Sequence, residues 1–217
     1  MKKKQLIAAL LLGVIVLPAL QGCFGVVATG VGTGVMTALD RRTLGTQTED
    51  EAIEWKAGSR VDDKLKDRGH FNFTSINRKV LISGEVVSAD VRTEAGNIVA
   101  KIPNVLGVFN ELIIGPSSSL TDRSNDSFTT SKVKSRSVDN GKFNPLNVKV
   151  VTEAGVVFLL GLVTQAEADA AIQVARTTSG VKKVVPLFEI ITPVRARELD
   201  LTQSDGNKSA TTQSGNP

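Results

Sequence analysis

Apolar residues recur along the first part of this chain with two spacings, one typical of helices and one typical of strands. Between Asp50 and Asp67 the spacing is near-helical, and acidic residues stand at the start of the segment. Four further segments predict a strand, a strand, a helix and a strand, at residues 75–76, 80–86, 92–101 and 105–114. The predicted order of elements is therefore α-β-β-α-β.

The same order is predicted a second time. An apolar segment centred on Gly84 has a counterpart centred on Gly161, 77 positions further along the chain. Asn125 or Asp126 is placed to cap a helix that runs to about Arg136. Two strands that meet in a turn at 153–155, a helix and a last strand follow, at residues 148–151, 156–162, 165–178 and 184–191. The pattern predicts an internal repeat of one small α+β domain.

This repeat divides the chain into segments of different composition. We expect the first domain at residues 49–115, a linker at 116–123 and the second domain at 124–193. Residues 194–217 are rich in Ser, Thr, Asn, Gly and Gln and are expected to be disordered. Each domain has only ~70 residues, near the lower limit for an independent core, so the two domains are expected to pack on each other.

The first 22 residues have the organisation of a cleaved signal peptide. A positive Lys2–Lys4 segment precedes an apolar run that is too short for a comfortable spanning helix, although an N-terminal membrane anchor is the alternative. Cys23, the only cysteine, follows Leu20-Gln21-Gly22 in the pattern of a bacterial lipobox. We therefore expect lipidation of Cys23, with residues 23–48 as a tether; an unmodified thiol is the alternative.

The net charge depends on this cleavage. The formal charge of the 217-residue chain is +4, but loss of the three N-terminal lysines leaves 23 basic and 22 acidic residues, a charge of +1. Nucleic acid is therefore not an expected partner. The first domain has 9 basic and 10 acidic residues over 50–115, and the second has 8 and 6 over 124–193. The second domain is thus the more basic.

No set of catalytic residues is recognisable. His70 is the only histidine, and a lone histidine is weak support for a metal site or a catalytic triad, so we expect it on a solvent-facing loop. Asp62, Asp63 and Asp67 interleave with basic residues, as on a solvated helix face. Trp55 is expected in the core or between the domains. The prediction is a protein without catalysis, cofactor or metal; a hydrolase with an unrecognised site is an alternative.

Several short segments, the most specific of them in the second domain, carry a resemblance to a known family. They cover residues 44–47, 124–128, 132–134, 147–150, 157–164 and 179–182. Together with the lipobox they resemble the BON-domain family, and within it the outer-membrane lipoproteins with two BON domains. The resemblance spans residues 20–191. It implies two tandem BON domains of the α+β class, each α-β-β-α-β with a small three-stranded mixed sheet and two helices.

The resemblance also implies a function. Such lipoproteins lie on the periplasmic face of the outer membrane, support its integrity, also at division sites, and bind anionic, phosphatidylglycerol-like phospholipid through the first helix of the second domain. The corresponding helix here is about 126–138. The implied phospholipid-binding residues are Phe128, Lys132, Val133, Lys134, Arg136 and Val138. Phe128 replaces a family Trp and Val138 a larger Leu, so binding is expected to be weaker.

Two interpretations of this helix are open from the residues themselves. A helix with basic and aromatic sides can lie on an anionic membrane, with Lys and Arg at phosphates and Phe among acyl chains. Alternatively, Phe128 and Val133 fill the core, and the lysines are a solvated face. The alternative function is a periplasmic interaction module for an envelope protein partner, through the first domain or a sheet edge.

Overall fold

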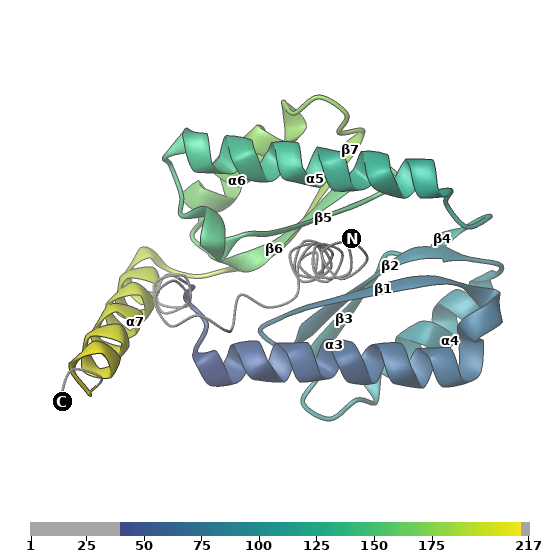
Figure 1. Ribbon diagram of the computed structural model, residues 1–217, viewed down its shortest axis with the longest axis horizontal. Helices are drawn as coiled ribbons and strands as arrows, with labels where there is room; N and C mark the ends of the chain where they lie inside the picture. The colour runs from purple at the N-terminus through teal and green to yellow at the C-terminus, as the bar shows by residue number, and fades with distance from the viewer. Residues whose placement is uncertain (1–39, 214–217) are drawn as a thin grey trace, which may run out of the picture. The chain divides into compact units, whose positions relative to one another are not determined.

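Two helix-and-strand repeats follow each other in the structure, a computed structural model that describes residues 40–213 (Figure 1). The predicted signal peptide, Cys23 and most of the predicted tether lie outside the described residues. Both repeats belong to one structural unit, Ala38–Pro217. The described helices include none that is both long enough and apolar enough to cross a bilayer.

The first domain has the predicted order of elements. They are α3 (Leu44–Leu65), the 3-10 turn η2 (Lys66–Arg68), β1 (Gly69–Ile76), β2 (Lys79–Val86), α4 (Ala89–Ala100), β3 (Gly107–Asn110) and β4 (Ile113–Ile114). β1 pairs antiparallel with β2, whereas β3 and β4 both pair parallel with β2. The sheet has four strands instead of three because the third strand is interrupted at Leu112, which turns into the core.

The predicted tether extends too far into the chain, because α3 begins at Leu44. Thr43 caps this helix by accepting a hydrogen bond from the backbone N–H of Thr46. A β-region Thr with its hydroxyl on the first turn is a favourable N-cap, so the helix starts six residues before the predicted position. The segment 44–48 is therefore part of the first domain.

The second domain repeats the architecture with three strands. Its elements are α5 (Leu120–Asn140), the 3-10 turn η3 (Pro145–Asn147), β5 (Lys149–Glu153), β6 (Val156–Val163), α6 (Gln165–Arg176) and β7 (Lys183–Ile190). β5 and β7 flank β6, antiparallel and parallel respectively. The predicted linker and cap were wrong here: α5 begins at Leu120, and Ser119 and Asp122 form its capping box.

A buried aspartate in the first helix of each domain holds the hairpin turn of that domain. Asp50 accepts hydrogen bonds from the backbone N–H groups of Asn77–Arg78 at 2.9 and 2.7 Å. Asp126 accepts the equivalent bonds from Ala154–Gly155 at 2.8 and 2.9 Å. All four turn residues have positive φ, between 50° and 79°, as in tight hairpin turns. Asp126 therefore fastens helix to hairpin and is no helix cap.

Gly84 and Gly161 occupy equivalent positions in the two sheets. A Cβ atom at Gly84 would lie 2.0 Å from the carbonyl oxygen of His70, and one at Gly161 would lie 2.0 Å from that of Asn147. Both glycines also have positive φ, at 119° and 153°. The backbone approach thus requires glycine in each repeat, and it makes His70 and Asn147 equivalent residues.

The central strand of each sheet is buried on both faces. Because side chains alternate along a strand, Val80 and Ile82 of β2 fill the first core, while Leu81 faces the other way. Likewise, Phe158 and Leu160 of β6 point away from the second core. These outward residues form a third apolar cluster, Ile76, Leu81, Phe158 and Leu160, which draws on both domains. The expected packing of one domain on the other is confirmed.

The prediction of disorder was wrong for most of the C-terminal segment, which forms helix α7 (Pro193–Gln213); residues 214–217 lie outside the described part of the chain. Proline is compatible with the first helical turn, where its missing N–H is not needed. Ala196 is buried, and the carboxylate of Asp200 accepts hydrogen bonds from Arg41 at 2.9 and 3.1 Å. Composition indicated too little apolar surface for folding here, but an ion pair with a distant residue supplies an additional contact.

Candidate functional site

Helix α5 buries one face and exposes the other. Its buried residues are Asp126, Thr129, Val133 and Ser137, at the three- and four-residue spacing of one helical face. Phe128 and Val138 lie away from this face and are 65% and 66% exposed. The two apolar side chains are separated by about 15 Å along the helix axis, given the helical rise. Neither is needed to fill the core.

Two of the six predicted lipid-binding residues have structural contacts instead. Val133 is 1% exposed and belongs to the second core, so its side chain does not reach the surface. Arg136 donates hydrogen bonds to the hydroxyls of Thr177 and Thr178 at 3.0 and 2.8 Å, near the end of α6. Arg136 therefore ties α5 to α6. The remaining four residues, Phe128, Lys132, Lys134 and Val138, are called the α5 face below.

Lysine and phenylalanine are directly associated on the α5 face. The Nζ atom of Lys132 lies 4.9 Å from the centre of the Phe128 ring, a cation–π distance. Lys132 also donates a hydrogen bond to the carbonyl oxygen of Ser179. The ammonium is thus held beside the exposed ring, with no carboxylate partner among the described residues.

The rest of the exposed side of α5 consists largely of serines, whose side chains are small. The hydroxyls of Ser124, Ser127 and Ser131 donate to the carbonyl oxygens four residues earlier, at 2.9, 3.0 and 3.0 Å. These hydroxyls are satisfied within the helix. Phe128 and Val138 consequently project from a surface of small side chains, as an aromatic and an aliphatic contact flanked by lysines.

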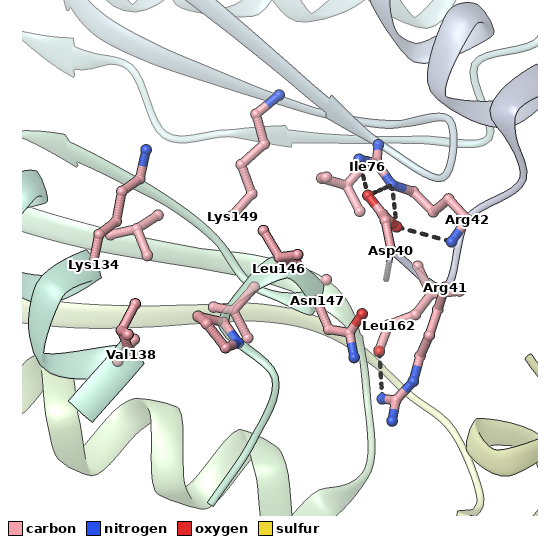
Figure 2. Close-up of a pocket in the computed structure, with 15 residues that line it drawn as sticks. Asp40, Arg41, Arg42, Ile76, Lys134, Val138, Leu146, Asn147, Lys149 and Leu162 are labelled. Carbon is pink, nitrogen blue, oxygen red and sulfur yellow. Dashed lines mark hydrogen bonds and ion pairs between the residues drawn. The ribbon is translucent and has the colours of Figure 1, made fainter. Parts of the chain in front are cut away.

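A cavity of about 330 Å³ adjoins the C-terminal half of α5 (Figure 2). Lys134 and Val138 line one side of it, and the segment Asp40–Arg42 lines the other. Leu146 and Asn147 of η3 lie between these sides. Asn147 is 6% exposed, and both polar atoms of its side chain lack a hydrogen-bond partner among the described residues. The cavity therefore combines apolar walls with one unsatisfied amide.

Most basic groups around the cavity are neutralised by carboxylates. Arg41 donates to Glu167 at 2.7 and 2.9 Å, and also to Asp200. Burial opposes the charge of Arg41, but these bonds outweigh it and raise the pKa of the guanidinium. Arg42 is paired with Asp40 and Asp50 at 2.7 Å each. Arg41 and Arg42 are therefore structural cations, not free ligands for an anion.

The same salt bridge perturbs its acidic partner. Burial of the Glu167 carboxyl favours its neutral form, but the hydrogen bonds from Arg41 and from the backbone of Thr164 hold its pKa below the ordinary value of 4.5. In contrast, Lys134 forms no salt bridge within the described part of the chain, and its ammonium remains available beside Val138.

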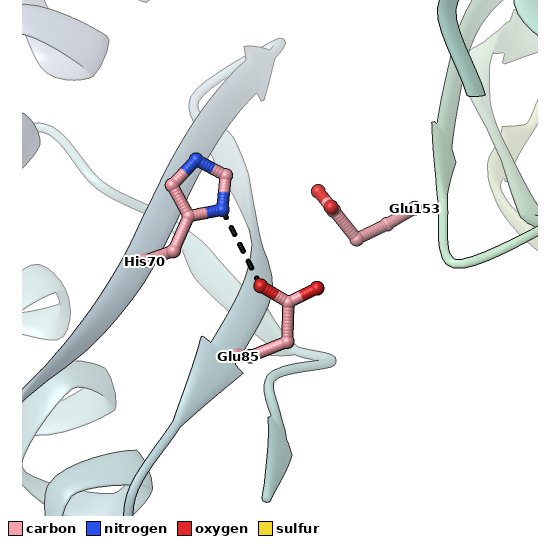
Figure 3. Close-up of side chains that lie close together, drawn as sticks. All are labelled: His70, Glu85 and Glu153. Atoms are coloured by element: carbon pink, nitrogen blue, oxygen red, sulfur yellow. Dashed lines mark ion pairs between the residues drawn. The ribbon is translucent and has the colours of Figure 1, made fainter. Parts of the chain in front are cut away.

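Two single residues lie where sequence reasoning did not expect them. Trp55 is 75% exposed on α3 and is neither core nor domain interface. His70 lies in strand β1, not in a loop, and its side chain points toward Glu85 and Glu153 (Figure 3). The sequence offers no local signal for this cluster, because Glu153 comes from the other domain.

The repeat, the mixed sheets and the helix order define a protein built from two BON domains. The profile of the BON-domain family matches residues 49–116 and 125–192. The chain belongs to the BON-domain family, which confirms the family resemblance and the fold class inferred from the sequence.

Particular relatives are similar over most of their length. The chain is 40% identical to Outer membrane lipoprotein DolP of Haemophilus influenzae over 185 residues, which cover 84% of this chain and 95% of that protein. It is 34% identical over 155 residues to a 21 kDa hemolysin of Actinobacillus pleuropneumoniae, covering 70% and 80%. Osmotically-inducible protein Y of Escherichia coli is 31% identical over 149 residues, covering 65% and 72%.

Proposed function

We propose that this protein is a lipoprotein of the outer membrane, attached at its periplasmic face through lipidated Cys23, and that its second BON domain binds anionic phospholipid through the α5 face. Similarity to an outer membrane lipoprotein over 95% of its length supports the location. Support of outer-membrane integrity, also at division sites, belongs to the same proposal. The family and the reported relatives favour a role without catalysis.

The observation that supports lipid binding is the exposed Phe128 ring with the ammonium group of Lys132 beside it. In water, 65% of this side chain is exposed, whereas in a bilayer interface the ring would lie among acyl chains. Full burial of a Phe contributes about 1.5–3 kcal/mol. Lys132 and Lys134 each add about 1 kcal/mol near an anionic surface.

These terms together predict weak, reversible binding. A total of about 3–5 kcal/mol corresponds to dissociation constants on the order of millimolar. The acyl chains on Cys23 would provide stable attachment, since each buried methylene contributes about 0.8 kcal/mol. In this proposal the anchor holds the protein at a membrane, and the α5 face selects regions rich in anionic lipid.

The adjoining cavity extends the apolar end of the α5 face. A lipid tail beside Val138 would meet the cavity walls at Leu146, not a polar surface. Lys134 lines the same cavity and could pair with the phosphate of that lipid. The absence of the indole N–H at Phe128 limits anchoring at the headgroup level.

Vesicle flotation tests this proposal. Residues 24–217 contain the whole unit Ala38–Pro217 and lack the predicted acyl anchor. We expect this chain to float with phosphatidylglycerol vesicles and to bind phosphatidylcholine vesicles at least tenfold less. Phe128→Glu should abolish the difference, because it places a carboxylate at the membrane. Leu106→Glu is the matched control: Leu106 is 61% exposed on the first domain, and its change should have no effect. Equal binding to both lipids would refute lipid selection.

Trp55 supports a second candidate function, a protein contact made by the first domain. A lone exposed Trp on α3 is the type of residue that dominates protein interfaces. If this function holds, a stoichiometric envelope partner should remain bound after lipid removal and should be lost in Trp55→Ala. Vesicle binding should be unchanged in that variant. If the unmodified protein and the Trp55→Ala variant retain the partner equally, Trp55 is not the contact.

A further inference from the structure

A histidine and two glutamates converge where the two domains meet (Figure 3). His70 and Glu85 come from paired strands of the first sheet, in which they are directly opposite each other. Glu153 comes from the end of β5 in the second domain. One donor atom from each of the three side chains lies within 4.8 Å of the other two.

The two carboxylates are buried without a basic partner. Glu85 and Glu153 are each 5% exposed, and within the described residues neither forms a salt bridge with Lys or Arg. Their hydrogen bonds come from neutral groups: Asn72 donates to Glu153 at 2.8 Å, and Ser118 donates to Glu85. Two buried carboxylates this close repel each other when both are ionised, and a bound cation would relieve that repulsion.

The histidine has a ring nitrogen available for this purpose. Its Nδ1 atom is buried and makes no hydrogen bond among the described residues. It lies 3.5 Å from Oε2 of Glu85, without hydrogen-bond geometry. A neutral imidazole offers a lone pair at such an atom, and imidazole together with carboxylates is a donor set that suits Zn²⁺.

We propose that His70, Glu85 and Glu153 bind a divalent transition-metal ion of the zinc type, which links the two BON domains. One such ion balances the charge of both carboxylates, and the unsatisfied ring nitrogen coordinates it. Asn72 and Ser118 orient the carboxylates from outside, as supporting hydrogen bonds do at metal sites. Since ligand atoms around tetrahedral zinc are about 3.4 Å apart, binding draws Glu153 toward the first sheet.

A path from solvent reaches this site. Glu85 lines a groove of about 610 Å³ that is also lined by Ser118 and by residues of α5. A hydrated ion can therefore approach one ligand from this groove before it meets the other two. His70 is itself partly exposed, which leaves room for a water ligand at the fourth position.

The internal repeat shows that this donor set is not a general property of the fold. The positions equivalent to His70, Glu85 and Glu153 in the other repeat are Asn147, Leu162 and Ile76, and all three line the cavity of Figure 2. The same fold therefore accepts amide and aliphatic side chains at these positions. The two acids and the histidine are not required for packing, and His70→Asn is a variant that the fold should tolerate.

Calorimetric titration of metal-free residues 24–217 with Zn²⁺ tests the proposal. We expect one saturable site per chain and a rise in Tm on binding. His70→Asn and Glu153→Gln should each weaken the affinity at least tenfold and remove the rise in Tm. Glu189→Gln is the control. The Glu189 carboxylate also lies between the domains, paired with Lys79, but it is outside the cluster, so the Zn²⁺ affinity of this variant should stay within twofold of that of the unmodified chain.

Three results would overturn the metal site. They are the absence of one-site binding, wild-type affinity in His70→Asn or Glu153→Gln, and an equal loss in Glu189→Gln. Circular dichroism of the metal-free variants shows whether they fold. The unmodified chain also gives a reading that needs no variant: with Co²⁺ we expect the intense visible bands of a four-coordinate ion. Weak bands typical of an octahedral aqua-like ion would contradict the assignment.

Discussion

Asp50 and Asp126 are equivalent residues of the two domains, so the stability loss predicted for a change at one can be compared with the loss at the other. Asp126→Ala removes two hydrogen bonds from backbone N–H groups to a charged acceptor, at 2.8 and 2.9 Å. Such bonds contribute about 1.5–3 kcal/mol each, but water can reach part of the opened turn. We therefore expect the free energy of unfolding to fall by about 2–4 kcal/mol.

Asp50→Ala should be the more damaging change. Asp50 makes the same two turn contacts, and in addition it accepts a bond from the hydroxyl of Ser75 at 2.6 Å and pairs with Arg42 at 2.7 Å. Asp50→Ala removes the partner of the Ser75 hydroxyl, and water cannot replace that partner because Ser75 is fully buried. Arg42 keeps Asp40 as a partner, so the additional loss comes mainly from the Ser75 hydroxyl, since an unsatisfied buried group costs about 1–3 kcal/mol. Added to the loss of the two turn bonds, this gives an expected total of about 3–6 kcal/mol.

Urea unfolding followed by circular dichroism measures both losses, and hydrogen exchange locates them. The amides of residues 77–78 should lose protection in Asp50→Ala, and those of 154–155 in Asp126→Ala. Asp62→Ala, an exposed change on the same helix as Asp50, should stay within about 0.5 kcal/mol. The reasoning is refuted if Asp126→Ala is as neutral as this control, or if the turn amides keep their protection.

Three further predictions follow from single features. Gly161→Ala should lower the free energy of unfolding by about 3 kcal/mol or more in urea titrations, because the new Cβ would lie 2.0 Å from the Asn147 carbonyl oxygen. Bonds from basic partners outweigh burial and hold the pKa values of Glu167 and Glu189 below 4.5, so the stability they contribute is complete above that pH. It should be lost as pH falls through the lowered pKa values, seen as a declining Tm; a Tm that is level below pH 4.5 would contradict this. Trp55, the only tryptophan, should show the emission and the acrylamide quenching of an exposed indole, and a blue-shifted, unquenched spectrum would place it elsewhere.

The regular elements of both domains were predictable because their signals are local. The α-β-β-α-β order follows from apolar spacing, and the hairpin at 153–155 follows from a short turn between two apolar runs. The errors lie at element ends, where capping and distant contacts decide. α5 starts early because Ser119 caps it, and α7 exists although its composition is polar. No local pattern reveals that Asp200 meets Arg41, 159 residues away.

The candidate site divides along the same line. The residue types on α5, an aromatic and several basic residues in the more basic domain, are properties of the sequence. Which of them are exposed is not: Val133 enters the core and Arg136 binds α6, because the position of a helix face depends on what packs against it. His70 and Glu85 meet through strand pairing within the first sheet. Glu153 joins them only through domain packing, which a one-dimensional pattern cannot reveal because it carries no distance between residues of different domains.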